Sequence, residues 1–69
     1  MTLILKSDCG LRVHYSTSQI RSIEHTVAGN LYNHSDLEGN GIKADESVMV
    51  INFNDGTQST FSSDWKIVF

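Results

Sequence analysis

The sequence predicts a small, mainly β protein folded as an antiparallel meander. Two apolar stretches, Leu3 to Tyr15 and Val48 to Phe61, are each interrupted by a short turn that contains glycine, which is typical of β-hairpins. The chain has 69 residues, no proline, and neither an internal repeat nor a low-complexity run. Residues 1–69 are therefore expected to form a single domain whose core is small for its surface.

The first hairpin is predicted to turn at Asp8-Cys9-Gly10, with Gly10 in a left-handed conformation. A three-residue loop pairs Ser7 with Leu11, and it pairs the residues on either side in the same register. One face of this hairpin then carries the apolar residues Leu3, Leu5, Leu11, Val13 and Tyr15. A longer loop would exchange the faces and set charges among these apolar residues, so we expect the three-residue loop.

The second hairpin is predicted to turn at Asn54-Asp55-Gly56. Its first strand, residues 48–53, is apolar on both faces, a pattern that favours a strand covered on both sides. The cover for the second face would come from barrel closure, from the C-terminal segment or from another subunit. The strand is therefore also a candidate for self-association, through Val48, Met49, Val50, Ile51 and Phe53.

Residues 16–30 fit two structures. A capping box of Ser16 with Gln19 and the helical spacing of Ile20, Ile23 and Val27 favour a short helix at 17–28. The many β-branched and serine residues oppose a helix and favour a tight turn over 16–19 followed by a strand from about Ile20 to Val27. We favour the turn and strand, and keep the helix as an α+β alternative.

This order of strands and turns resembles the layout of small SH3-like or Sm-like β-barrels of about five strands. The tail is expected to pack back as a final short strand or single turn, with Trp65 as a lid on the core. The resemblance implies an architecture and no activity, because such barrels have many unrelated functions.

An acidic loop is predicted at about 34–47. Asp36, Glu38, Asp45 and Glu46 against Lys43 give this segment a charge of −4 + 1 = −3, which is the net charge of the whole chain. The segment begins like a calcium-binding loop, but Ser47 stands where the bidentate glutamate of such a loop belongs. We therefore expect no metal site there. The segment fits two interpretations: a plain solvated connection, or a docking surface on which the four acidic residues meet a basic partner.

Other chemistry finds little support in the sequence. Cys9 and the histidines at 14, 25 and 34 lack the close spacing of zinc ligands, and no spaced catalytic motif is present. A domain of this size is expected to have little room for a substrate cleft. We expect no enzyme activity and no cofactor.

Nucleic-acid binding is the alternative function. The outer face of the first hairpin offers Lys6, Arg12 and His14, with Arg21 nearby, and small barrels bind nucleic acid by adding stacking aromatics to such a face. The pI of about 5.3 opposes this interpretation.

The sequence thus favours a small interaction protein that binds and occludes a macromolecular partner with a basic surface, and that forms a homodimer. A structural subunit of a larger assembly is a further alternative. The short apolar start predicts neither a signal peptide nor a membrane span, so a cytoplasmic location is expected. In length and acidity the chain is similar to phage and mobile-element inhibitors, anti-CRISPR proteins included.

Overall fold

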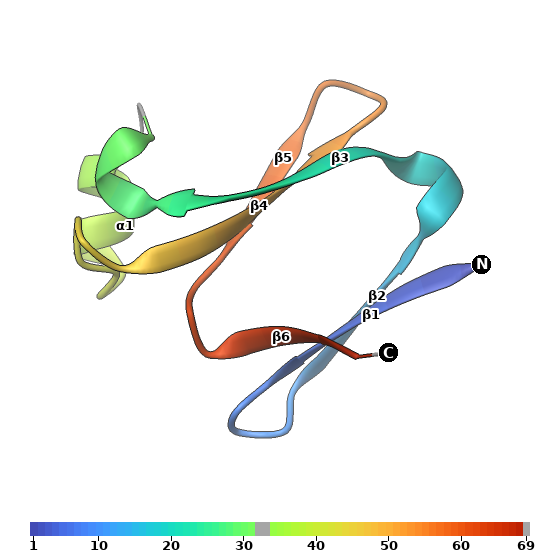
Figure 1. Ribbon diagram of the computed structural model, residues 1–69, viewed down its shortest axis with the longest axis horizontal. Helices are drawn as coiled ribbons and strands as arrows, with labels where there is room; N and C mark the ends of the chain where they lie inside the picture. The colour runs from blue at the N-terminus through green and yellow to red at the C-terminus, as the bar shows by residue number, and fades with distance from the viewer. Residues whose placement is uncertain (32–33, 69) are drawn as a thin grey trace.

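Six strands form two three-stranded antiparallel sheets that face each other in a computed structural model (Figure 1). The structure describes residues 1–31 and 34–68, without the side chain of His34. The strands are β1 (Thr2–Ser7), β2 (Arg12–Ser16), β3 (Ile20–Val27), β4 (Ser47–Phe53), β5 (Gln58–Phe61) and β6 (Trp65–Val68). The helical elements are the 3₁₀ turns η1 (Thr17–Gln19) and η2 (Ala28–Asn30) and the short α-helix α1 (His34–Gly39). The prediction of a mainly β antiparallel meander is confirmed.

The first sheet has the order β2-β1-β6. Its hairpin has the predicted register, with Leu3 opposite Tyr15 and Leu5 opposite Val13, and Gly10 has a positive φ of 92°. The prediction fails for one residue: Leu11 lies outside the interior and is 61% exposed. It directly follows the turn residues Asp8 to Gly10 and precedes β2, at the tip of the hairpin.

The second sheet has the order β3-β4-β5. Residues 20–27 are a strand, as favoured, and the helical alternative is limited to the single turn η1. A β-bulge between Ile20 and Ser22 explains the earlier ambiguity. Because a bulge inserts one extra residue, Ile20 and Ile23 reach the same face of the strand at a spacing of three, which otherwise suggests a helix.

The main core lies between the two sheets. Leu5, Met49 and Ile51 are its buried centre, and Trp65 packs against them, so the expected lid is present on the final strand β6. β6 pairs with β1 and completes the first sheet. Within residues 1–31 and 34–68, the backbone ladders form two separate sheets rather than a closed five-stranded barrel.

β4 is buried on both faces, as its sequence predicts, but its outer cover differs from the three that were expected. Val48 packs with Ala28 and Leu37, so η2 and α1 cover this end of the strand. Further along the same face, Val50 lies between residues of β3 and β5, and Asn52 donates hydrogen bonds to Ser22 Oγ and Glu24 Oε1. The outer face is therefore closed by local segments of the same chain.

Candidate binding surfaces

The acidic segment is a folded unit and not a loop throughout. Its first six residues form α1, and Leu37 from this helix joins Ala28 and Val48 in a small second core, with Leu31 and Ile42 packed around it. Sequence reasoning missed the helix because six residues are too few for a periodic pattern. Isolated helices this short are unstable in water, so the contact made by Leu37 is what stabilises α1.

Backbone hydrogen bonds attach the rest of the segment to η2. The amide of Ala28 donates to Glu46 O at 2.9 Å, and the amide of Gly29 donates to Ala44 O at 2.8 Å. A side chain on Gly29 would place its Cβ 3.0 Å from Ala44 O, tighter than an ordinary contact, so the close approach favours glycine. The segment is thereby held in one position against the second sheet.

We name the four acidic residues of this segment the acidic cap: Asp36, Glu38, Asp45 and Glu46. Their side chains differ in solvent exposure and in hydrogen bonding. The first three are exposed, whereas Glu46 is half-buried and accepts a hydrogen bond from the Ser63 amide at 3.3 Å. Within the described part of the chain, none of the four forms an ion pair. The cap thus presents three unpaired carboxylates on an ordered support.

The cap does not have the geometry of a calcium loop. Asp36 and Glu38 both lie on α1, two residues apart, so their side chains project to different sides of the helix. Asn40 uses its amide to donate to Asp36 O at 2.9 Å. No group of three or more possible metal ligands occurs among the described residues.

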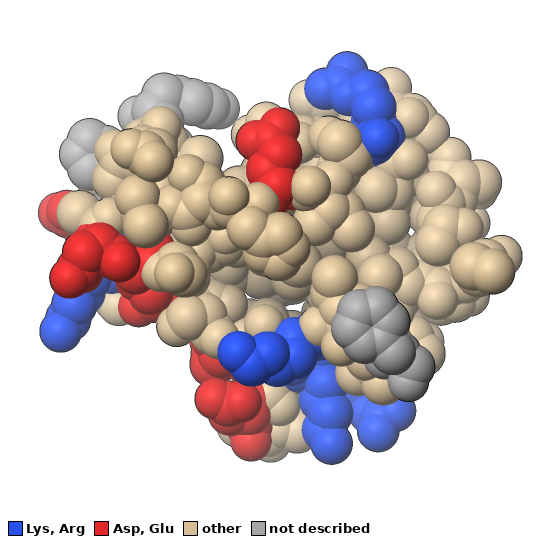
Figure 2. Space-filling view, viewed as in Figure 1, with Lys and Arg blue, Asp and Glu red and all other residues tan. Residues whose placement is uncertain are grey.

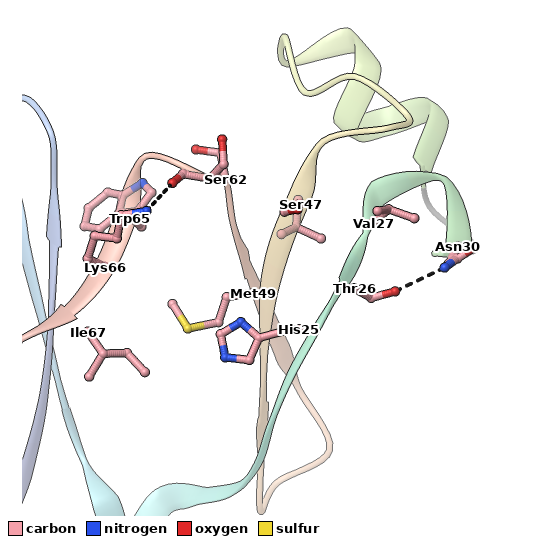
Figure 3. Close-up of a pocket in the computed structure, with 12 residues that line it drawn as sticks. His25, Thr26, Val27, Asn30, Ser47, Met49, Ser62, Trp65, Lys66 and Ile67 are labelled. Atoms are coloured by element: carbon pink, nitrogen blue, oxygen red, sulfur yellow. Dashed lines mark hydrogen bonds between the residues drawn. The ribbon is translucent and has the colours of Figure 1, made fainter.

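A groove of about 810 Å³ opens between the two sheets below the cap (Figure 3). Val27 and Met49 line one side of it, and Trp65 and Ile67 from β6 face them. His25 lies beside Met49 on the paired strand. The groove is open to solvent, and it leaves apolar side chains that face each other across the two sheets partly uncovered.

The groove has serines and one histidine, but they are not arranged for nucleophilic catalysis. His25 is exposed and makes no hydrogen bond with any residue that the structure describes, including the serines of the rim. A nucleophile needs a base within hydrogen-bond reach. The lining that Met49, Trp65 and Ile67 provide suits an apolar side chain.

The outer face of the first sheet carries a line of three cations. Lys6 on the central strand lies directly opposite Arg12 on β2 and directly opposite Lys66 on β6. All three side chains are exposed. We name Arg12, Lys6 and Lys66 the basic row. Figure 2 shows blue side chains gathered in the lower part of the molecule, where Figure 1 places these strands, with red side chains beside them, and further red side chains around α1.

The basic row corrects the nucleic-acid face that the sequence indicates. Lys6 and Arg12 are neighbours as expected, and His14 lies on the same face opposite Ile4, but Arg21 belongs to the bulge of the other sheet. Lys66 was missed because it is distant in sequence. The expected stacking aromatics point inward: Tyr15 contacts Phe53 and Phe61, with ring centroids 5.1 and 6.3 Å apart.

The candidate strand for self-association has both backbone edges occupied. β4 is the central strand of its sheet, paired with β3 on one side and with β5 on the other. Its side chains from Val48 to Ile51 are buried. A second copy would therefore have to pair with one of the edge strands β2, β3, β5 or β6, and not with β4.

Comparison with known proteins found no matching family model, no matching curated protein and no matching solved structure. None of the described helices has the length and apolar character needed to cross a membrane. The surfaces themselves must therefore support any proposal about function.

Proposed function

We propose that the protein is a non-enzymatic binding protein that holds a basic segment of a macromolecular partner and occludes it. The observation that carries this proposal is the position of the acidic cap, which holds three unpaired carboxylates and lies beside an apolar groove. Glu46 connects the acidic cap to the groove directly, because its carboxylate accepts a hydrogen bond from the backbone amide of Ser63 on the rim of the groove.

The two features have complementary roles in binding. Exposed charges mainly accelerate the encounter and select partners of opposite charge. Most of the binding energy at interfaces comes from a few apolar or aromatic side chains buried in a pocket. A partner segment with lysines or arginines beside one large apolar residue would therefore fit the cap and the groove together.

The kind of partner that would fit the acidic cap suggests a biological role for the protein. Nucleic-acid-binding enzymes expose such basic segments, and a protein that covers one would act as a cytoplasmic inhibitor. The short acidic chain is in keeping with inhibitors from phages and mobile elements, including those directed against CRISPR enzymes. A homodimer would present two caps to a partner and raise its effective affinity.

The test measures binding of a labelled Lys/Arg-rich peptide with one central Phe by fluorescence anisotropy. The cap variant is Asp36→Asn with Glu38→Gln, and its control is Asp8→Asn with Glu24→Gln, so that both proteins have a net charge of −3 + 2 = −1. The cap variant is expected to bind up to about tenfold more weakly, as two exposed ion pairs are lost.

The control variant is expected to retain wild-type affinity, and replacing Phe by Ala in the peptide should weaken binding to the wild type. Equal losses in both protein variants would show unspecific attraction to a negative chain and would refute the proposal. Thermal melting of each variant confirms that the fold is intact.

A further inference from the structure

We propose that the basic row is a binding site for the phosphate backbone of duplex nucleic acid, separate from the acidic cap. Adjacent strands of a sheet lie about 4.8 Å apart, so the three cations project from one face along a line of about 10 Å. Arg12, Lys6 and Lys66 occupy directly paired positions, which fixes them side by side.

This arrangement is unfavourable for the protein alone. Like charges directly opposite each other on neighbouring strands destabilise a sheet. None of the three forms an ion pair with a residue that the structure describes, and Lys66 makes only an exposed hydrogen bond from Nζ to Ser63 O at 3.3 Å. An anionic ligand would relieve the repulsion.

The surroundings of the row indicate which part of a nucleic acid it contacts. The same face carries Ile4 and His14, while Tyr15 and Trp65 lie in the ring contacts between the sheets. Binding of single strands depends on aromatic side chains that stack on bases. Among the residues that the structure describes, this sheet face carries cations and no Phe, Tyr or Trp side chain. Such a face suits the phosphates on the outside of a duplex, which carry no sequence information.

The number of cations sets the expected salt dependence. Each phosphate neutralised contributes about −0.9 to the slope of log K against log salt concentration on a duplex, so three contacts give about −2.7. By the same relation, each contact contributes about tenfold to the affinity at 50 mM salt. Three contacts then correspond to a Kd on the order of 10⁻⁴ to 10⁻³ M, which is weak and suited to NMR titration.

The experiment titrates the ¹⁵N-labelled protein with 12-base-pair DNA duplexes of two unrelated sequences at several salt concentrations. The test variant is Lys6→Gln with Lys66→Gln, and the control is Arg21→Gln with Lys43→Gln, so both have a net charge of −3 − 2 = −5. For the test variant, we expect affinity to fall about 100-fold at 50 mM salt, so that the DNA concentrations that shift the wild-type signals cause no shifts. Arg12→Gln alone should give a slope of about −1.8 and serves if the double variant folds poorly.

Support for the proposal requires shifts confined to β1, β2 and β6, equal binding of both DNA sequences, and a control variant that keeps the slope of the wild type. An RNA duplex is expected to bind as well, because the ligand is the phosphate backbone. Tighter binding of single-stranded DNA, comparable binding of polyglutamate, or an equal loss of affinity in the control variant would overturn it.

Discussion

Replacing Leu37 by Ala is expected to open the segment around α1 while the two sheets stay folded. The side chain of Leu37 is 9% exposed and belongs to the small core with Ala28 and Val48, separate from the main core around Leu5 and Ile51. Leucine-to-alanine changes in cores cost about 2–5 kcal/mol, and a side chain at the margin of the protein falls near 2 kcal/mol. A domain of 69 residues has a total stability of about 3–10 kcal/mol, so this cost is large but not sufficient to unfold the sheets.

Amide hydrogen exchange provides the measurement. The amides of Asn40 and Ile42 both donate to Leu37 O, at 3.0 and 2.9 Å, so their exchange reports whether this turn is closed. A loss of 2 kcal/mol corresponds to exchange about 30 times faster at these amides. Leu11→Ala is the matched control, because Leu11 is exposed and its removal should leave exchange unchanged.

Two results would refute this reasoning. If exchange in β1 and β4 rises by the same factor as in the acidic segment, the segment and the sheets unfold as one unit. If no amide changes, some contact other than that of Leu37 holds the helix. The variant should also lose affinity for the basic peptide, since the acidic cap depends on an ordered α1.

Three further predictions test separate parts of the structure. Gly29→Ala should destabilise the protein by about 1 kcal/mol, because its new Cβ crowds a backbone carbonyl. Gly39→Ala should stabilise the protein by about 0.3 kcal/mol, because a Cβ at position 39 has no neighbouring atom within 4 Å. Thermal melting of the two variants measures the difference. Lys6→Glu should raise the free energy of unfolding by about 0.5–2 kcal/mol, since two repulsive pairs become attractive, and a lower value in denaturant titration would contradict the assigned register. Hydrogen bonds from Thr57 lower the pKa of Asp55 below its ordinary 3.8, so the stability this carboxylate contributes is present above that pH and is lost as pH falls through the lower, folded-state pKa. Asp55→Asn should flatten melting temperature against pH in that acid range, and curves parallel to the wild type would show that another group is responsible.

Local signals in the sequence were sufficient for the hairpins. A glycine at the third loop position fixes the turn, and in both hairpins the residue before the loop bonds the residue after it, as in Phe53 N to Thr57 O at 2.9 Å. The strand at 20–27 could only be favoured, because a β-bulge gives its two isoleucines a spacing that also fits a helix. The pattern is ambiguous there because the structure departs from strict alternation.

Contacts between distant parts of the chain account for what was missed. α1 is stabilised by packing on Val48, and no local pattern in six residues indicates such a contact. Lys66 joins the basic row only because the last strand pairs with β1, and its position opposite Lys6 depends on that register. The hydrogen bond that sets Glu46 apart from the other three acidic residues comes from Ser63, which is distant in sequence.

The net charge of the chain was a poor guide to the basic row, because a binding partner responds to the charges close to it. At physiological ionic strength the electrostatic screening length is about 8 Å, whereas the molecule measures 33 × 29 × 16 Å. The acidic cap and the basic row lie on different parts of it, and outside the cap segment the charges of the chain cancel. A ligand at the basic row therefore meets three cations although the protein is acidic overall. The pI that opposed nucleic-acid binding is an average over two surfaces of opposite charge, so it does not describe either surface alone.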